Sequence, residues 1–330
     1  MRNPQRSSVT RTKACISRPF WAACILGLLL STSGVNAQTT TNAYDAATNS
    51  VYTGFSSGLN GGFGFGAWTI SGTGGGSYIQ GSTPTPITSG KAFAIWNDTI
   101  NTVRSAQRTF NSPLAAGQTF TFARQVNSLN STMTGAVQLQ DTNGNILFQF
   151  WHKGGDNADG HYADATTTNG TATGFAYNFQ AYKSYSFKLT TPSNYVFINV
   201  TDSKTLTGTI TGTVAKVVFV RQNGSAASSG GTDYRFDKLT ISSDPVTFQS
   251  QVPAVNSYSA IRTNVSVQAL DGGNAVNTNT IVMKVDGSTV TPSITKASGV
   301  TTINYNPGAP FGAGTTHNAF VRLADSARGC

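Results

Sequence analysis

The chain contains no glutamate, since all 13 of its acidic residues are aspartates. Glycoside hydrolysis normally depends on a pair of carboxylates, one acting as an acid and the other as a base or nucleophile. Two aspartates can serve as such a pair, but only two groups of them lie close together in the sequence. These groups are Asp156, Asp159 and Asp164, and Asp233 with Asp237. Neither group matches a catalytic motif, so the sequence favours binding or scaffolding over catalysis.

No segment has the roughly 20 consecutive apolar residues that a membrane-spanning helix needs. The apolar run FWAACILGLLL at 20–30 follows five basic residues and no acid, and small residues follow it up to Ala37. This order of basic, apolar and small segments is typical of a secretory signal. We therefore expect residues 1–37 to be a signal peptide and the protein to be secreted, extracellular or at the cell surface. No membrane span is expected after the signal is removed.

Removal of the signal changes the cysteine and charge counts. Cys15 and Cys24 leave with it, so Cys330 alone remains and no internal disulfide is expected. Five of the 22 lysines and arginines also leave, so that 17 basic residues remain against 13 acidic ones. With so few charges and no cluster of Lys or Arg, the chain lacks the basic patch that nucleic-acid binding requires.

Sustained helical periodicity is also missing after the signal. Short runs of β-branched and aromatic residues alternate with Gly, Asn, Ser and Pro turns, which predicts an all-β fold. In residues 38–244 these runs predict strands at 91–97, 106–110, 118–126, 135–141, 145–152, 185–190, 195–201, 205–211, 214–221 and 234–242. A tight hairpin turn is expected at Asn143-Gly144. Many short strands at this spacing are typical of a large two-sheet, jelly-roll-like sandwich.

The pattern changes near Pro245, where we place a domain boundary. Residues 245–330 predict a smaller β-sandwich with strands at 264–270, 280–285, 288–296, 300–305 and 317–324. Asp286-Gly287 is expected to form the hairpin turn between the second and third of these strands. The sequence stops without a closing turn, which leaves open whether this domain is complete and whether the chain is part of a longer protein.

Several stretches resemble known modules. The segments GGFGFGAWTI at 61–70, GKAFAIWN at 90–97 and YRFDKLTI at 234–241 resemble the concanavalin-A-like or jelly-roll sandwiches of secreted bacterial proteins. The segments VPA at 252–254, DGGN at 271–274, NTNTI at 277–281 and GTTH at 314–317 resemble a bacterial immunoglobulin-like domain. The resemblance implies two β-sandwiches of the kind found beside carbohydrate-binding or carbohydrate-cleaving units. Sugar-cleaving enzymes on such sandwiches use paired glutamates, which this chain lacks, and the likeness specifies fold better than function.

One Gly-x-Ser-x-Gly pattern occurs, at 54–58. In an esterase this motif places the nucleophilic serine between a strand and a helix. The residues that follow, LNGG at 59–62, cannot start a stable helix, so we interpret the match as a glycine-rich loop. The same stretch is not a phosphate-binding loop, because no Gly-Lys-Ser/Thr follows it.

Polar residues gather between 152 and 164. His152 and His161 flank a loop that contains Asp156 and Asp159, and Asp164 follows shortly afterwards. Oxygen-rich loops can hold calcium, although an Asp- and Asn-rich loop is more often a solvated turn. We take the three aspartates as candidate calcium ligands, with the solvated turn as the alternative. Two histidines without a cysteine or a third histidine argue against a transition metal.

Aromatic residues provide the best ligand hypothesis, because flat rings stack on sugars while nearby Asn, Asp and Gln bond to hydroxyls. Trp68 and Trp96 fit a buried core, since large aromatics are mostly buried. Trp151 lies at a predicted strand end beside the polar loop, where binding residues tend to collect. Tyr177 is a further aromatic in the same region. The candidate ligand-binding residues are Trp96, Trp151, His152, His161 and Tyr162.

Three functions remain open. The first is a secreted, non-catalytic binding module for an extracellular or cell-wall polysaccharide. The second is a structural or adhesive surface protein in which both domains act as spacers. The third is an accessory part of a polysaccharide-acting enzyme. An exposed aromatic platform favours the first over the second, and two aspartates about 5–10 Å apart in a cleft favour the third.

Overall fold

The computed structural model describes residues 39–81, 90–126, 133–154, 159–176, 181–223, 233–254, 264–312 and 314–326. Within these ranges the regular structure is β-strand and no helix occurs, so the predicted all-β fold is confirmed. The described part of the chain accordingly offers no helix long and apolar enough to cross a membrane. The predicted signal peptide at 1–37 and Cys330 lie outside the described residues.

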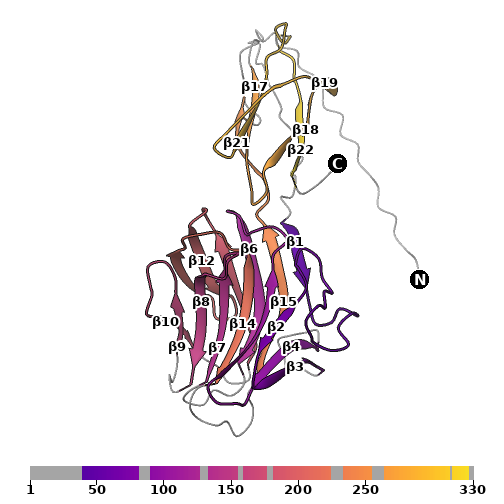
Figure 1. Ribbon diagram of the computed structural model, residues 1–330. Helices are drawn as coiled ribbons and strands as arrows, with labels where there is room; N and C mark the ends of the chain where they lie inside the picture. The colour runs from indigo at the N-terminus through magenta and orange to yellow at the C-terminus, as the bar shows by residue number, and fades with distance from the viewer. Residues whose placement is uncertain are drawn as a thin grey trace, which may run out of the picture.

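Four antiparallel sheets form a larger and a smaller body, drawn below and above in Figure 1. The eight-stranded sheet of the larger body runs in the order β13 (Lys204–Thr209), β12 (Asn194–Asn199), β11 (Lys183–Leu189), β6 (Gln118–Val126), β15 (Asp233–Ser243), β4 (Ala92–Asn97) and β3 (Gly75–Gln80), and β1 (Thr40–Asp45) pairs with β15. The seven-stranded sheet runs in the order β10 (Thr171–Ala176), β9 (Asp159–Ala163), β8 (Ile146–Lys153), β7 (Thr134–Gln140), β14 (Lys216–Asn223), β5 (Thr102–Thr109) and β2 (Thr69–Gly72).

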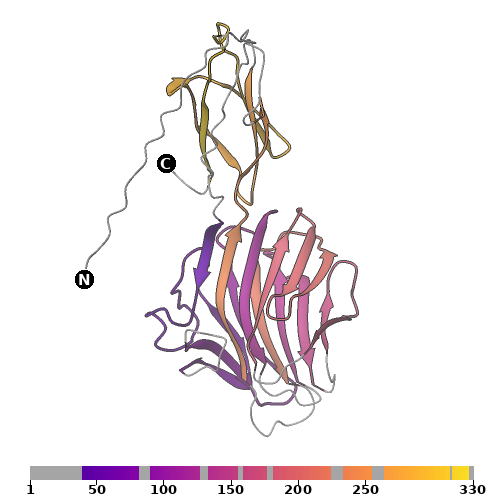
Figure 2. The same cartoon turned by 180° about the vertical axis from the view of Figure 1, so that it is seen from behind.

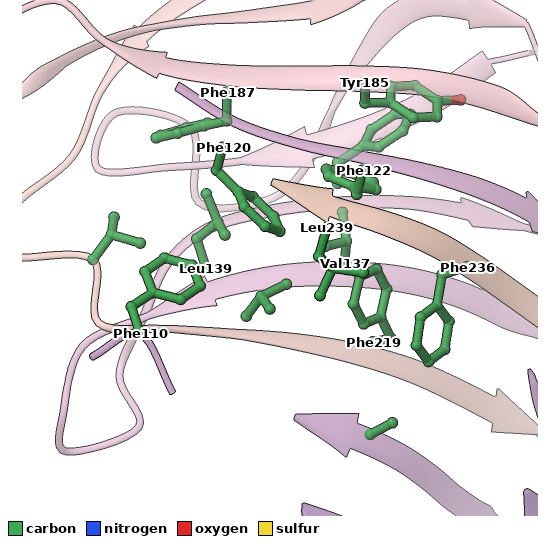
Figure 3. Packing of buried hydrophobic residues seen from close by; sticks show 14 of the residues in the cluster. Phe110, Phe120, Phe122, Val137, Leu139, Tyr185, Phe187, Phe219, Phe236 and Leu239 are labelled. Atoms are coloured by element: carbon green, nitrogen blue, oxygen red, sulfur yellow. The ribbon is translucent and has the colours of Figure 1, made fainter. Parts of the chain in front are cut away.

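The core between these two sheets consists largely of aromatic rings (Figure 3). Phe219 of β14 stacks on Phe236 of β15 with ring centroids 3.9 Å apart and planes 2° apart, which joins one sheet to the other. On β6, Phe122 packs against Phe219 across the core and against Tyr185 within its own sheet. Such aromatic pairs add about 0.5–1.5 kcal/mol each beyond the burial of their surface. The predicted two-sheet sandwich thus has one continuous aromatic interior.

The sequence pattern located the central strands of both bodies and missed six others. The turn at 143–144 is confirmed, with Gly144 at a φ of 95°, and so is the Asp286-Gly287 turn, where φ is 49° and 79°. The missed strands are β1, β2, β3, β9, β10 and β16. Of these, β2, β3, β9 and β10 lie in or beside glycine-rich or Asp- and Asn-rich sequence that resembles loop. The strand predicted at 288–296 is wrong. It divides at Pro292 into β19 (Ser288–Val290) and β20 (Ser293–Ala297), because proline cannot donate to a ladder.

The glycine-rich segment at 61–66 forms an extra rung beside β1. Tyr44 and Phe63 exchange both backbone hydrogen bonds, each 3.0 Å long. A Cβ atom at Gly62 would lie 2.1 Å from the carbonyl oxygen of Tyr44, and Gly64 has a φ of 76°, so both positions require glycine. Phe63 is 53% exposed on the surface, whereas Phe65 is buried in the core. The positive φ of Gly64 between them interrupts the alternation that would place both rings on one face.

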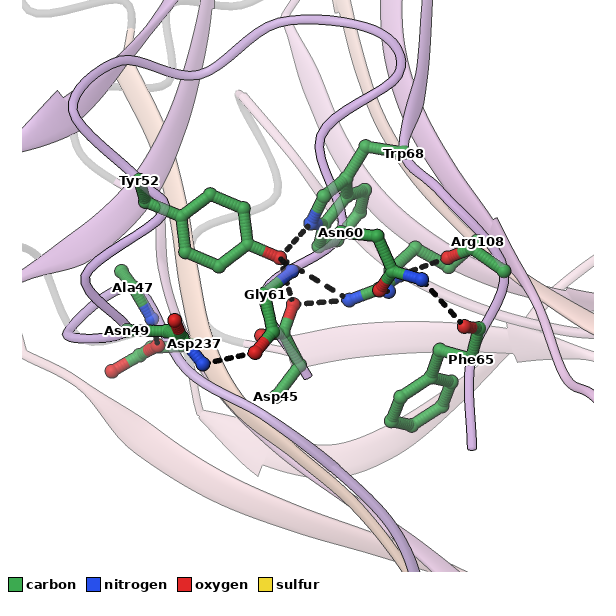
Figure 4. A network of polar contacts seen from close by, with 11 residues as sticks. Asp45, Ala47, Asn49, Tyr52, Asn60, Gly61, Phe65, Trp68, Arg108 and Asp237 are labelled. Carbon is green, nitrogen blue, oxygen red and sulfur yellow. Dashed lines mark hydrogen bonds and ion pairs between the residues drawn. The ribbon is translucent and has the colours of Figure 1, made fainter. Parts of the chain in front are cut away.

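A buried ion pair attaches this N-terminal region to the sandwich (Figure 4). The guanidinium of Arg108 on β5 contacts the carboxylate of Asp45 on β1, and both side chains are fully buried. The hydroxyl of Tyr52 donates to Asp45 at 2.6 Å and accepts from the indole nitrogen of Trp68 at 3.2 Å. Burial, together with the hydrogen bond to Asp45, raises the pKa of Tyr52 to about 12. The network therefore ties four sequence-distant segments to one buried charge pair.

The smaller body also contains two sheets. One has the order β16 (Thr247–Val252), β17 (Val265–Leu270), β21 (Val300–Tyr305) and β20, and the other has the order β19, β18 (Val276–Val285) and β22 (Ala319–Asp325). Its small core centres on Val265, Met283 and Ile303. In both views the chain passes from β15 into this body at one end of the larger one (Figure 2). Its immunoglobulin-like character and the boundary near Pro245 remain predictions.

Candidate functional site

Strand β8 places two predicted site residues on opposite sides of the seven-stranded sheet. Phe148 and Phe150 point into the core, so by alternation His152 also points inward. Gln149 and Trp151 therefore face outward, away from the eight-stranded sheet. Only the outward residues of this strand are placed to meet a ligand at the surface.

Trp151 and His161 form a pair of neighbouring rings on this outer face. They are cross-strand partners on β8 and β9, with ring centroids 5.8 Å apart and planes tilted by 23°. Both side chains are half-buried. A Cβ atom at Gly170 would lie 2.6 Å from the indole ring, so the backbone before β10 lies against the ring and positions it. The pair provides a nearly continuous aromatic surface that spans two strands.

Amide side chains lie directly beside this aromatic pair. Gln138 of β7 pairs with Gln149 of β8, and its amide nitrogen donates to the Gln149 carbonyl at 2.9 Å. Gln140 donates in turn to Gln138 at 2.7 Å. The same row continues through Val218 to Gln107 on β5. Sequence analysis missed these glutamines. Alternation groups Gln149 with Trp151 on one side of β8, and Gln138 with Gln140 on one side of β7, but it does not show which side faces solvent.

His152 lies between the sheets and is buried. Its Nδ1 lies 2.6 Å from Nη2 of Arg124, which can only donate, so the other ring nitrogen donates to the carbonyl of Phe175 at 3.2 Å. Burial and the adjacent Arg124 charge hold the pKa of His152 well below its ordinary value. The neutral ring is thus committed to interior hydrogen bonds and does not lie on the outer face of the sheet.

The other two predicted aromatic residues lie apart from Trp151. Tyr162 pairs with Phe150 and packs against the core from the inner side of the seven-stranded sheet. Trp96 of β4 is half-buried on the outer face of the opposite, eight-stranded sheet, against Gly76. Trp68 is 1% exposed, as predicted for a core residue. Tyr177 lies outside the described residues.

The three candidate calcium ligands are not seen as a cluster. Asp156 and the side chain of Asp159 lie outside the described part of the structure, which contains no group of three His, Cys, Asp or Glu residues able to hold a metal. Asp164 accepts hydrogen bonds from the backbone of Thr166 and Thr167, both 2.9 Å, and from the Tyr195 hydroxyl at 2.8 Å. Burial opposes ionisation, but these bonds outweigh it and lower the pKa of Asp164. Asp164 shapes the turn after β9, and calcium binding remains a prediction.

The aspartates of the second sequence cluster have separate roles. Asp233 accepts from Arg235 at 2.7 Å, and Arg235 also donates to Gln125 at 2.8 Å on the outer face of the eight-stranded sheet. Asp237 is fully buried and accepts from the backbone nitrogen of Ala47 at 2.7 Å. Asp233 therefore positions Arg235 of its own strand, and Asp237 holds the segment that follows β1 against β15.

One arrangement in the smaller body resembles a catalytic relay. His317 lies 2.6 Å from the carboxylate of Asp286 and 2.5 Å from the hydroxyl of Thr315. That hydroxyl also donates to the carbonyl of Gly312 at 2.5 Å, which lies in the same loop. The contacts of this group link the turn at Asp286 to the loop before β22.

The 54–58 segment lacks the surroundings of an esterase motif. No helix follows it in the described structure. The hydroxyl of Ser57 donates to the backbone carbonyl of Ile70 and accepts from the backbone nitrogen of the same residue. The interpretation as a glycine-rich loop agrees with this placement.

No family model matches the chain, and no curated protein sequence matches it. Solved structures align with parts of it. A sialidase aligns at a TM-score of 0.40 and 9% identity over 53% of this chain, which spans 16% of the sialidase chain. A carbohydrate esterase from the Shiga toxin-encoding bacteriophage phi24B aligns at a TM-score of 0.40 and 13% identity, over 62% of this chain and 99% of the esterase. A protein of unknown function from Shewanella oneidensis MR-1 aligns at a TM-score of 0.41 and 15% identity, over 65% of this chain and 90% of that protein. At these low scores and identities, the alignments do not identify a ligand.

Proposed function

We propose that this is an exported, non-catalytic carbohydrate-binding protein of the extracellular space or cell surface. Its ligand is an uncharged stretch of polysaccharide, which lies on the outer face of the seven-stranded sheet. The observation that supports this proposal most directly is that the Trp151–His161 ring pair borders a row of glutamine amides on the same face. A sugar ring has an apolar face that suits an indole, and hydroxyls at its rim that suit amides able both to donate and to accept.

The charge distribution of this face supports an uncharged ligand. The two central outward rows consist of Gln107, Val218, Gln138 and Gln149, and of Ser105, Val220, Ala136, Trp151 and His161. Neither row contains Asp, Lys or Arg. Lys153 and Lys216 lie beyond the rows, at their margins. The absence of a carboxylate from these rows also argues for binding without acid–base hydrolysis.

The test compares residues 38–330 of the wild type with two tryptophan variants on a glycan array, with and without calcium. Trp151→Ala removes the proposed platform, and we expect the affinity for any bound glycan to fall at least about tenfold, or roughly 1.4 kcal/mol. Trp96→Ala is the matched control, because it removes the same half-buried side chain from the opposite face. It is expected to leave the affinity unchanged.

Unfolding midpoints separate lost binding from lost structure. We expect Trp151→Ala to change the midpoint little, because surface substitutions typically change stability by about 0.5 kcal/mol or less and this ring is only half-buried. A weakened affinity in Trp96→Ala alone would move the site to the other sheet. If the wild type bound no glycan in either buffer, the carbohydrate function would be wrong and the spacer function would be favoured.

A further inference from the structure

A small cavity lies inside the larger sandwich, on the side of β8 opposite to Trp151. Its lining includes Arg124 of β6, His152 of β8, and Lys183 and Tyr185 of β11. The space left for the centre of a water-sized occupant is about 10 Å³. A single small ion or a water molecule fits such a volume, whereas a sugar ring or a phosphate group does not.

The guanidinium of Arg124 is buried and contacts no carboxylate among the described residues. Its side chain is 2% exposed and contacts the Gly135 carbonyl, the Tyr234 hydroxyl and the neutral ring of His152. The ring of Phe150 lies 4.2 Å from its central carbon. An arginine keeps its charge in proteins, and every one of these contacts is uncharged. The positive charge of Arg124 is therefore solvated by dipoles and rings but not neutralised.

One donor of Arg124 also has no acceptor. Its Nε–H is buried and has no hydrogen-bond partner within the described part of the chain. Buried donors are almost always satisfied, by protein or by an ordered ligand. An orphan donor on a fully charged group that lines a cavity points to an occupant with a lone pair.

A second cation lines the same cavity. Lys183 donates to the carbonyl of Ala176 at 3.1 Å and forms an ion pair with Asp202. An ammonium group has three protons, so one remains after these two contacts. Asp202 offsets the charge of Lys183, and His152 is neutral. Within the described residues, the lining therefore retains one unbalanced positive charge, that of Arg124. A water molecule would satisfy the orphan donor but would leave this charge in place.

We propose that the cavity binds one small monovalent anion, such as chloride, held by Arg124 and Lys183. The anion neutralises the buried guanidinium. It also links the two sheets of the sandwich, because Arg124 and Lys183 belong to the eight-stranded sheet and His152 to the seven-stranded sheet. Neither the residues nor the chemistry of this site overlap with the proposed carbohydrate face.

The first experiment measures the melting temperature of the protein in sodium chloride and in sodium gluconate at equal ionic strength. Gluconate is too large for the cavity. A ligand that binds only the folded state raises stability with the logarithm of its concentration. We therefore expect about 3–6 °C per tenfold increase in chloride above its dissociation constant, and no comparable increase in gluconate.

Two variants and one crystallographic probe decide the interpretation. Arg124→Met should abolish the difference in melting temperature between the two salts. Arg104→Gln should keep this difference, because Arg104 does not line the cavity and donates to the backbone carbonyl of Gly72 instead. Crystals of the wild type soaked in bromide should show an anomalous peak in the cavity, which does not depend on the variant being folded. The proposal would be overturned if the wild type had the same melting temperature in both salts, or if the difference between the salts persisted in Arg124→Met. It would also be overturned if the crystals showed only a water molecule in the cavity.

Discussion

The buried pair of Asp45 and Arg108 permits a quantitative test of what secures the N-terminal strand. We consider Asp45→Asn, Arg108→Met and the double variant. Both side chains are fully buried, and Arg108 also bonds to the Gly66 carbonyl at 2.7 Å and lies 5.1 Å from the ring of Trp68. Each single variant leaves one charge in the interior without its partner.

The expected cost follows from that leftover charge. Removal of one partner from a buried ion pair typically costs about 3–5 kcal/mol, which is a large part of the roughly 5–15 kcal/mol that stabilises a whole protein. The double variant removes both charges, so its loss should be smaller than the sum of the single losses by about 1–3 kcal/mol. The pair would then contribute mainly by mutual neutralisation.

The two single variants should differ in their dependence on pH. Burial raises the pKa of Asp45, while the Tyr52 hydrogen bond and the Arg108 charge oppose this rise. Loss of Arg108 raises that pKa further, so Asp45 takes up a proton as the pH falls and the cost of Arg108→Met decreases. Arg108 cannot give up its proton, so the cost of Asp45→Asn should not decrease in the same way.

Equilibrium unfolding in urea, followed by tryptophan fluorescence, measures these losses. The tryptophans of the described chain, Trp68, Trp96 and Trp151, all lie in the larger sandwich, and Trp68 belongs to the network itself. The signal therefore reports the body that contains the pair. Additive losses in the double variant, or equal pH dependence of the two single variants, would refute the account of a coupled charge pair.

Two further predictions concern the glycine-rich segment and the turn after β9. Gly62→Ala should lower the free energy of unfolding by about 1–3 kcal/mol, because the new Cβ would lie 2.1 Å from the Tyr44 carbonyl oxygen. Gly54→Ala is its control, because a Cβ there meets nothing within 4 Å. Equal losses of stability in the two variants would contradict the packing argument. The lowered pKa of Asp164 means that its carboxylate stabilises the fold above its ordinary pKa of about 3.9 and that this contribution is lost as the pH falls below that value. Urea titrations at neutral and acidic pH measure the free energy of unfolding, and acidification should lower it less in Asp164→Asn than in the wild type. If both proteins lost the same free energy of unfolding, the acid sensitivity would come from other groups.

The strands that the sequence predicted are those whose patterns are local. The Asn143-Gly144 and Asp286-Gly287 turns require positive φ, and β-branched or aromatic runs flank them on both sides. The strand at the N-terminal end and the rung beside it owe their extended conformation to partners that are distant in the sequence. In β1 and in the rung at Phe63 the strand conformation is maintained by pairing with β15 and with Tyr44, which no local propensity reveals.

The candidate site shows the same division. The sequence singled out Trp151 and His161, and alternation grouped Trp151 with Gln149 on one side of their strand. Both sides of that strand carry apolar residues, so the pattern did not determine which side faces solvent. His152 belongs to the predicted binding set because it flanks the polar loop before His161. It is one residue from Trp151, however, and one residue along a strand reverses the direction of the side chain.

Composition and local pattern alone determined that the chain is all-β, placed its main hairpins and identified the lack of glutamate. Tertiary structure decided what each side chain contacts. It placed the neutral ring of His152 beside the buried charge of Arg124. It also brought the glutamines of β7 and β8 beside Trp151. The reason is physical: strand propensity and turn chemistry act between neighbouring residues, whereas burial, charge pairing and the choice of exposed face depend on which strands pair and how the two sheets pack.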